Sequence, residues 1–380
     1  MSPPTSISAG SRPIVITEIE QFGGAERSAL ALARWLNQRG LPVHIVTYAD
    51  HCNLAAYASH PLPVVELKAA GTRNRIRALR AYFKDRAPQP LLSGYQPALH
   101  ATLAGLRGFH DLMHDTPSLF GDQQNRSLKG KLRIAISNRI IGWGLRSGGT
   151  TIVTSEYLRA ECRRDFGVDA KIARMGDMNP ASSQAASATP LHHGPSDPLN
   201  MLSVCRIEAN KRIDWMLRAL GQLEQSAVSP LRAPLSTLAD WHLDLVGKGS
   251  LIPELTRLAE SLGIGSRVHF HGFVSDQDLD PLYGNAHLFL MPAVQGYGIP
   301  AIESLERGIP VLLHRESGVS DILLDTPWAT VLAGGEAELA PLLAEAVGGI
   351  LKGSHLGVAP PALPTEDQWA QRVVELCTWG

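Results

Sequence analysis

The sequence predicts an α/β protein made of two Rossmann-like β/α/β domains, each a parallel sheet covered by helices. Short apolar segments alternate with amphipathic segments along the whole chain, and glycines follow several of the apolar segments. Repeated strand–helix–strand units of this size form parallel sheets. The 380 residues are enough for two or three domains with their own cores. Residues 179–197, rich in Ser, Ala and Pro without an apolar period, separate the two halves.

In the first half, residues 13–17 predict a buried strand that Gly23 and Gly24 terminate. A helix follows over residues 25–40, with apolar residues at helical spacing, and the next strand covers residues 43–47. In the second half, the same patterns predict strands over 200–204, 242–246, 268–270, 287–291 and 311–313, and helices over 213–223, 252–262 and 300–307.

These elements divide the chain into a flexible tail (1–12), an N-terminal domain (13–180), a linker (181–198), a C-terminal domain (199–360) and a final helix (361–380). We expect the final helix to cross back to the N-terminal domain. Two such domains predict a cleft between them, and ligands of open parallel sheets bind at the carboxyl ends of the strands.

The charges are distributed unevenly along the chain. Residues 1–180 contain 23 Lys and Arg against 14 Asp and Glu, whereas the remaining residues contain 12 against 22. A basic half suggests an anionic partner. Residues 71–86 and 126–146 read as basic helical segments with apolar residues, which suit either an anionic membrane surface or a packed helix with a solvated basic face. Nucleic acid is disfavoured because aromatic residues do not interleave with the cations.

No segment reads as a signal peptide or a membrane span. The four cysteines show no paired spacing, which favours reduced thiols and a cytoplasmic protein.

The most informative segment is residues 291–304. A strand-like run ends before a glycine loop that contains Gly298, and a helix opens at Pro300 with Glu303 in its first turns. Amide groups of such a loop and helix start bind anions and hydroxyls, and a carboxylate just inside the helix suits a ribose diol.

Arg206 and Lys211 follow another strand, and two cations near a helix start suit a diphosphate, unless they are solvated surface residues. Gly23 and Gly24 lie between a strand and a helix, where they either approach a phosphate or sugar or form a tight turn. The segment Val246-Gly-Lys-Gly-Ser250 lacks Walker spacing and reads as a strand–helix turn. Gly272 follows a strand, where its backbone could frame a base. His114 ends an apolar stretch, where it either contacts a sugar or is structural.

The ordered set of these motifs over about residues 13–325 resembles the retaining glycosyltransferases of family 4 (glycosyl transferases group 1), which have the GT-B fold. The resemblance implies a nucleotide-sugar donor bound mainly by the C-terminal domain and an acceptor bound mainly by the N-terminal domain. It also implies retention of anomeric configuration without an essential metal ion or other cofactor. By position, Arg206 and Lys211 would hold the diphosphate and Glu303 the ribose. Gly298, Ile299 and Pro300 would lie near the sugar and phosphate, Gly23 and Gly24 near the donor phosphate or the acceptor, and His114 near the reacting sugar.

The acceptor that we expect is a glycan or a lipid-linked molecule, in cell-surface polysaccharide or glycolipid synthesis. An anionic membrane is a candidate partner through the basic N-terminal domain, with the protein peripheral on the inner face of the cell membrane.

The chain departs from the family at two points. The family's pair of glutamates separated by seven residues is here Gln295 and Glu303, and the chain has Met175-Gly-Asp177 where the family usually has Asn-Gly before the linker. An amide at position 295 can still hydrogen-bond but supplies no negative charge. Two alternatives therefore accompany the glycosyltransferase: a non-catalytic nucleotide-sugar-binding protein, and a sugar-nucleotide epimerase or phosphorylase of the same fold. The ordered family motifs argue against the latter.

Overall fold

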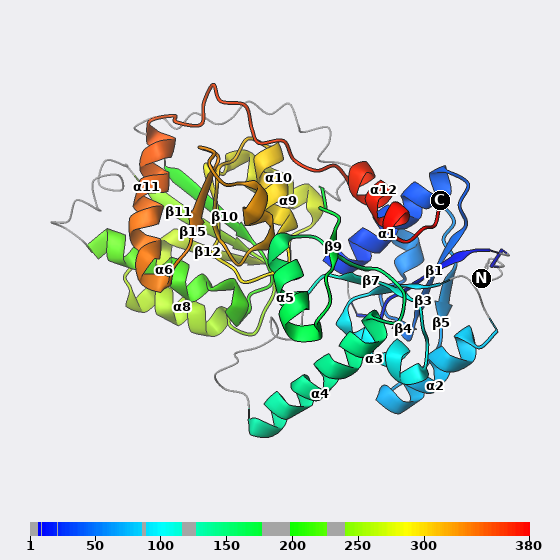
Figure 1. The fold of residues 1–380 in the computed structure, drawn as a ribbon. Helices are drawn as coiled ribbons and strands as arrows, with labels where there is room; N and C mark the ends of the chain where they lie inside the picture. Colours follow the sequence, from blue (N-terminus) through cyan, green and yellow to red (C-terminus); the bar gives the residue numbers. More distant parts are fainter. Residues whose placement is uncertain are drawn as a thin grey trace. The chain divides into compact units, whose positions relative to one another are not determined.

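The computed structural model describes residues 7–8, 10–20, 22–85, 89–115, 127–176, 198–225 and 240–380. The chain forms two compact units. Unit 1 consists of residues 1–178 and 364–380, and unit 2 consists of residues 179–363 (Figure 1). The predicted linker lies outside the described residues except for its last position, as does Asp177.

In the described part of unit 1, seven strands form one parallel sheet in the order β5-β3-β1-β6-β7-β8-β9. Their bounds are β1 (Arg12–Val15), β3 (Val43–Thr47), β5 (Val64–Glu66), β6 (Leu91–Ser93), β7 (His110–Met113), β8 (Thr151–Val153) and β9 (Lys171–Ile172). A short parallel pair, β2 (Glu18–Ile19) and β4 (Ala49–Asp50), lies apart from it. The helices are α1 (Gly24–Gln38), α2 (Thr72–Phe83), α3 (Tyr95–Ala104), α4 (Leu128–Leu145), α5 (Glu156–Phe166) and α12 (Glu366–Leu376).

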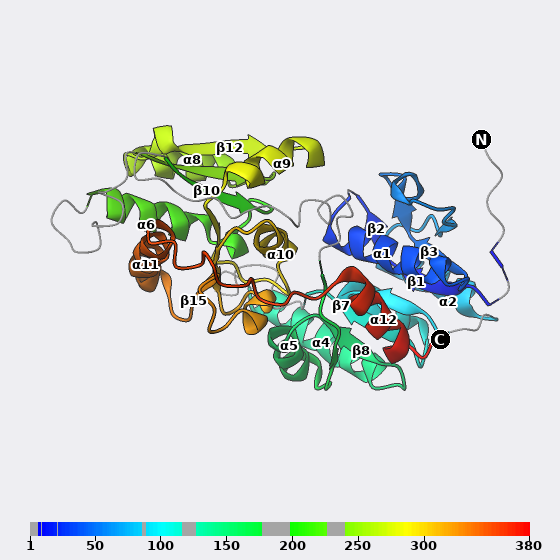
Figure 2. The same cartoon turned by 90° about the horizontal axis from the view of Figure 1, so that it is seen from above.

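The C-terminal helix α12 packs beside α1, so both ends of the chain contribute to unit 1 (Figures 1 and 2). A capping box at Thr365 and Gln368 starts α12. A Cβ atom at Gly176 would lie 2.5 Å from the Pro364 carbonyl oxygen, so only glycine permits this approach of the returning chain. The guanidinium of Arg12 donates to the Trp379 carbonyl oxygen.

The N-terminal tail predicted over residues 1–12 extends too far into the chain, because its last two residues are part of the fold. β1 begins at Arg12, and the buried Ser11 hydrogen-bonds to His44 Nδ1 over 2.8 Å. Residues 1–6 and 9 lie outside the described residues.

In the described part of unit 2, six strands form a parallel sheet in the order β12-β11-β10-β13-β14-β15. They are β10 (Leu199–Val204), β11 (Trp241–Val246), β12 (Val268–Gly272), β13 (Leu288–Met291), β14 (Val311–His314) and β15 (Ala329–Leu332). The helices are α6 (Ile213–Gln225), α8 (Ile252–Ser261), α9 (Asp276–Asn285), α10 (Ile299–Glu306) and α11 (Leu339–Leu351).

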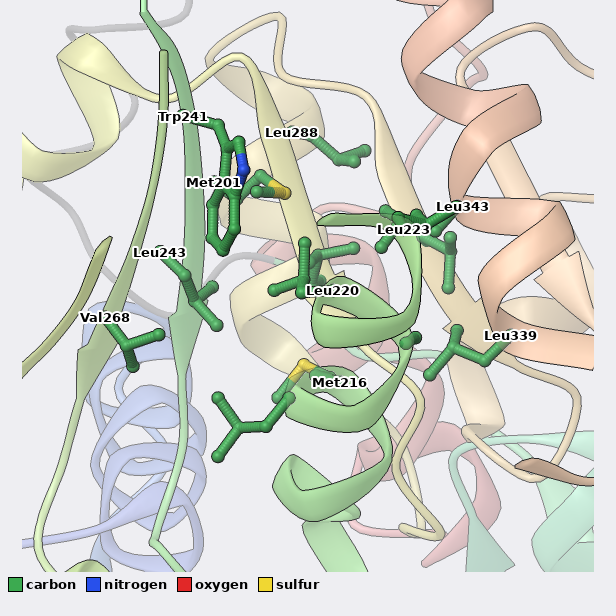
Figure 3. Packing of buried hydrophobic residues seen from close by; sticks show 14 of the residues in the cluster. Met201, Met216, Leu220, Leu223, Trp241, Leu243, Val268, Leu288, Leu339 and Leu343 are labelled. Atoms are coloured by element: carbon green, nitrogen blue, oxygen red, sulfur yellow. The ribbon is translucent and has the colours of Figure 1, made fainter. Parts of the chain in front are cut away.

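The core of unit 2 lies between the sheet and the neighbouring helices α6 and α11. Figure 3 shows Met216 and Leu220 of α6 beside strand residues Met201 and Leu243, with Leu223 close to Leu343 of α11. The apolar residues of α6 recur at helical spacing, which places them on one face, and this face packs against the strands.

Candidate functional site

The strand order of unit 2 reverses between β10 and β13, which pair in parallel at the centre of the sheet. The connections that follow these two strands therefore lead to opposite sides, and such a switch point is where parallel sheets bind ligands. The β10 connection carries Arg206 and Lys211, and the β13 connection carries Gln295 and Gly298.

The switch point is occupied by a chain of side-chain hydrogen bonds. Lys211 Nζ donates to Gln295 Oε1 over 2.7 Å. Gln295 Nε2 donates to Ser317 Oγ over 2.9 Å and contacts Met291 Sδ at 3.6 Å. The Ser317 hydroxyl in turn donates to the Tyr297 carbonyl oxygen over 3.0 Å. Gln295 is only 9 % exposed, so its amide is a buried support for the ammonium group of Lys211.

Backbone bonds tie the same loops together. The Gln295 N–H donates to the Glu316 carbonyl oxygen, and the Gly318 N–H donates to the Gln295 carbonyl oxygen, both over 3.1 Å. The Val294 N–H donates to the Asn210 carbonyl oxygen over 2.9 Å, and Asn210 Nδ2 donates to the Val294 carbonyl oxygen over 3.1 Å. Lys211 therefore ends a short 3-10 helix (Ala209–Lys211) whose position is determined by the β13 loop.

Arg212, directly after Lys211, has a structural role that the sequence did not reveal. Its backbone has φ 52°, which separates the 3-10 helix from α6. Its guanidinium donates to Glu316 over 2.7 Å and lies 4.3 Å from the Trp215 ring centre. The pair joins the connections that follow β10 and β14.

Arg206 is more accessible than Lys211. Its side chain is 54 % exposed and pairs with Glu208 over 2.8 Å. The backbone beside it is packed closely against the β11 loop: a Cβ atom at Gly247 would lie 1.8 Å from the Cys205 carbonyl oxygen, and one at Gly249 would lie 2.0 Å from the Ile207 carbonyl oxygen. The glycines of Val246-Gly-Lys-Gly249 thus allow two strand ends to meet.

Glu303 lies in α10, where the Tyr283 hydroxyl of α9 donates to its Oε2 over 2.8 Å. Arg307 donates to the Glu303 carbonyl oxygen, and its guanidinium carbon lies 4.6 Å from the Tyr283 ring centre. These contacts orient the carboxylate.

Gly298 precedes Ile299 and Pro300 at the start of α10 and has φ 122°. A Cβ atom there would lie 2.6 Å from Gln295 Nε2. Both the backbone conformation and the contact therefore require glycine. Gly272, with φ 67°, ends β12 and accepts a bond of 2.7 Å from the Gly247 N–H.

In unit 1, Gly23 and Gly24 do not present two unoccupied amides. The Gly23 N–H donates to the Glu26 carboxylate over 3.0 Å, and Gly23 is the N-cap residue of α1. Burial raises the pKa of Glu26. In this conformation the Gly23 amide is therefore occupied by an acidic side chain, and the expectation that Gly23 lies near the donor phosphate or the acceptor stays a prediction. Gly24, the first residue of α1, has open space around it.

His114 follows β7, and its Nε2 lies 3.1 Å from Ser93 Oγ at the end of β6. Burial lowers the pKa of His114 to about 4, so the imidazole is neutral at neutral pH. A neutral ring can both donate and accept a hydrogen bond, which suits contact with a hydroxyl group.

A cavity of about 580 Å³ in unit 2 lies elsewhere. Leu288, Val311 and Ala329 line it, and each is the first residue of its strand. It is therefore at the amino edge of the sheet, opposite to the residues above.

The structure thus joins Lys211 to Gln295 and places Arg206, Gly298 and Glu303 on the same or neighbouring strand ends. Sequence reasoning missed the supporting residues Ser317, Tyr283, Ser93 and Glu26. Two signals were available: Ser317 and Ser93 each lie just after or at the end of a strand, and Glu26 stands at capping-box spacing from Gly23.

Two family models match the chain. The model of Glycosyltransferase Family 4 matches residues 22–175, and the model of Glycosyl transferases group 1 matches residues 192–345. Between them they cover most of both units. Within the described residues, we find no helix long and apolar enough to cross a membrane.

The curated relatives include the GDP-mannose-dependent alpha-(1-6)-phosphatidylinositol monomannoside mannosyltransferase of Mycolicibacterium smegmatis. It is 25% identical over 320 residues, which span 74% of this chain and 79% of the relative.

Solved structures share the fold. WaaG, a glycosyltransferase involved in lipopolysaccharide biosynthesis, superposes with a TM-score of 0.68 at 16% identity, covering 97% of this chain and all of WaaG. HepE of Anabaena, in complex with UDP and glucose, gives a TM-score of 0.65 at 15% identity over 97% of this chain and 99% of HepE.

Proposed function

The chain belongs to the family 4 glycosyltransferases of GT-B architecture, in polysaccharide or glycolipid synthesis, and from that premise we propose a retaining, metal-independent transfer from a nucleotide-sugar donor. In this proposal unit 2 binds the donor and unit 1 binds a glycan or lipid-linked acceptor. The single observation that carries the donor assignment is the Lys211–Gln295 pair, which holds an ammonium group at the switch point of the unit 2 sheet.

The neutral partner of Lys211 matters for the electrostatics. The Gln295 amide takes no charge away from the ammonium group, whereas a carboxylate at that position would largely neutralise it. Lys211 can therefore stabilise the negative charge that develops on a leaving diphosphate, and Arg206 can add a second, forked contact after leaving Glu208.

The reaction then needs no protein nucleophile. The acceptor hydroxyl attacks the anomeric carbon on the face from which the diphosphate departs, and its proton passes to the departing phosphate oxygen. The protein orients both reactants and stabilises the leaving group. Glu303, whose carboxylate is oriented by Tyr283, would hold the ribose. Neutral His114 would hydrogen-bond the reacting sugar or the acceptor.

The compartment is part of the proposal. All four cysteines are free thiols, which fits a reducing environment. We therefore place the reaction in the cytoplasm, at the inner face of the cell membrane.

Replacing the two cations tests the donor site. Arg206→Ala and Lys211→Ala should each lower kcat/KM by about 30- to 1000-fold, equivalent to about 2–4 kcal/mol of transition-state stabilisation. Arg257→Ala is the matched control, because Arg257 is an exposed cation of α8 whose side chain bonds the Pro253 carbonyl oxygen. The name of the mycobacterial relative makes GDP-mannose the first donor to assay, followed by UDP and ADP sugars. Near-wild-type turnover by both variants would remove the diphosphate assignment.

Stereochemistry and metal dependence are tested separately. We expect the product to keep the anomeric configuration of the donor, measured by NMR of the new linkage. We also expect turnover to persist in a chelator, because Arg206 and Lys211 supply positive charge at the diphosphate. Loss of activity with chelator and recovery with magnesium or manganese would contradict this part of the proposal.

A non-catalytic nucleotide-sugar-binding protein is the second candidate, and the uncharged Gln295 is the observation that favours it. Tight binding of a nucleotide sugar by the purified protein, with neither transfer nor hydrolysis for any acceptor, would support that alternative.

A further inference from the structure

Helix α4 of unit 1 exposes a row of large apolar side chains. Leu128, Leu132, Ile136 and Trp143 are 86 %, 62 %, 51 % and 56 % exposed. They are spaced by four, four and seven residues, so they lie on one face of the helix. Exposed apolar residues scattered singly are ordinary on a soluble protein, but large ones at successive turns of one face mark an interaction surface. Arg139 lies between Ile136 and Trp143 on this face.

This row is available because only the C-terminal end of α4 packs against the rest of the described part of unit 1. Residues 128–140 contain no buried position, whereas Ile141, Gly142, Gly144 and Leu145 are buried. A Cβ atom at Gly142 would lie 2.3 Å from the Phe166 carbonyl oxygen, and one at Gly144 would lie 1.8 Å from Thr102 Oγ1. Because these two glycines have no side chain, the C-terminal part of α4 packs closely against α3 and α5. The rest of the helix extends past α3 (Figure 1).

The same helix is basic. Residues 127–146 contain no Asp or Glu but five cations, four of them on the exposed part: Lys129, Lys131, Arg133 and Arg139. Among the described residues, none of these four forms an ion pair with a carboxylate. The guanidinium of Arg107 lies 3.8 Å from the Trp143 ring centre, which adds a further cation at the end of the row.

We propose that this surface, formed by the apolar row and the four cations and hereafter called the α4 surface, docks on an anionic phospholipid bilayer. The helix would lie in the plane of the headgroups, with the apolar row in the acyl boundary and the cations at lipid phosphates. Trp143 suits the same depth, because tryptophan is enriched at membrane–water interfaces.

Charge distinguishes this occupant from a second copy of the chain. Two α4 surfaces facing each other would bring eight cations together without a carboxylate from either helix. An anionic bilayer supplies the missing charge over the whole length of α4. The proposal is independent of the donor chemistry, because binding to vesicles can be measured without turnover.

Vesicle sedimentation tests the proposal with the full chain. We expect binding to vesicles of phosphatidylcholine mixed with phosphatidylglycerol, and at least tenfold weaker binding to phosphatidylcholine alone. Raising the salt concentration should weaken binding to the mixed vesicles, because the cations are exposed. The variant Leu132→Ser/Ile136→Ser should bind the mixed vesicles at least tenfold more weakly. The variant Lys129→Gln/Lys131→Gln/Arg133→Gln should show a loss of the same order and lose its preference for phosphatidylglycerol.

Matched controls distinguish binding through the α4 surface from non-specific binding of other exposed apolar and basic residues to vesicles. Leu324→Ser/Val358→Ser removes two exposed apolar side chains from unit 2, and Arg257→Gln/Lys352→Gln removes two exposed cations there. Both controls should bind within twofold of the wild type. Circular dichroism checks that every variant is folded, which is expected because the altered side chains are exposed.

Equal vesicle binding by the α4 variants and the wild type would overturn the proposal. It would also fail if the wild type bound no vesicles and the α4 variants instead changed the oligomeric state in analytical ultracentrifugation, because that result would make a second copy the occupant.

Discussion

Gln295 is the residue at which this chain departs from its family, and its contacts show why an amide fits there. The Ser317 hydroxyl gives its proton to the Tyr297 carbonyl oxygen, so the Ser317 oxygen acts as an acceptor for Gln295 Nε2. A glutamate would bring a second acceptor to this position at 2.9 Å. It would also neutralise Lys211. The surroundings are therefore matched to glutamine, which argues that position 295 serves to position Lys211.

Substitutions at position 295 distinguish two readings: that Gln295 positions Lys211, or that loss of the family's carboxylate has inactivated the enzyme. Gln295→Ala should lower kcat/KM by about 10- to 100-fold, because the charge-assisted hydrogen bond that holds Lys211 is worth about 1.5–3 kcal/mol. Gln295→Glu should stay within about tenfold of the wild type, equivalent to about 1.4 kcal/mol, because the retained hold on Lys211 offsets the poor contact with Ser317. Steady-state kinetics with varied donor is the measurement. An inactive wild type that becomes active as Gln295→Glu would show that the missing carboxylate had disabled the enzyme.

Ser317 gives a second test at the residue scale. Ser317→Ala should raise KM for the donor more than it lowers kcat, with kcat/KM falling by about 2- to 10-fold, because the hydrogen bond that holds the Gln295 amide, worth about 0.5–1.5 kcal/mol, is lost. Ser320→Ala is the control, since Ser320 is also buried and donates to the Arg315 carbonyl oxygen. Equal kinetic losses in both variants would reduce the role of Ser317 to general stability.

At the scale of elements, the start of α10 determines where Gln295 and Glu303 lie. Gly298→Ala would introduce a Cβ atom 2.6 Å from Gln295 Nε2 and a strained backbone at φ 122°. We expect a loss of nucleotide binding of at least tenfold by calorimetry and a destabilisation of about 1–3 kcal/mol.

Gly284→Ala in α9 is the matched control for this substitution. No atom lies within 4 Å of its ideal Cβ position, and alanine is the better helix former. Retention of full binding by Gly298→Ala would mean that the α10 start adapts and does not orient the donor site.

The strands and helices were largely predictable from the sequence because their signals are local. β3 covers the residues that the apolar run 43–47 predicted, and α6, α8 and α10 begin within one residue of their predicted starts. The supports of the site were not predictable in this way. Ser317 lies 22 residues from Gln295, and Tyr283 lies 20 residues from Glu303, so only the folded sheet brings them together. The basic helices α2 and α4 were both expected, but the exposure of α4 depends on how little of it packs against its neighbours in the fold, which is not a local signal.

For the whole molecule, the charge asymmetry agrees with the separate tasks that we propose for the two units. The basic residues 1–180 include the α4 surface, whereas the acidic second half contains the cations Arg206 and Lys211 at one strand end. An otherwise acidic half disfavours nonspecific binding of anions away from these two cations.

Two buried histidines of unit 1 give the molecule a pH-dependent stability. Burial and, secondarily, the charge of Arg75 lower the pKa of His100 to about 4, and its Nδ1 lies 3.0 Å from the Tyr48 hydroxyl. Burial also lowers the pKa of His114 to about 4. In the unfolded chain histidine has a pKa of about 6.5. Between these values the unfolded chain binds more protons than the native chain. The free energy of unfolding is therefore fully retained above about pH 6.5 and falls as the pH decreases toward 4.

The expected loss for each histidine is about 2 kcal/mol between pH 7 and pH 5, from the difference between the two pKa values. Urea unfolding followed by tryptophan fluorescence at the two pH values measures it. His100→Asn and His114→Asn should each fold at pH 7 and show a smaller decrease in the urea midpoint on acidification than the wild type, because one titrating group has been removed. Carboxylates contribute to the remaining decrease in all three proteins and cancel in the comparison. An unchanged pH dependence in both variants would show that protonation of these two histidines does not limit the stability of unit 1.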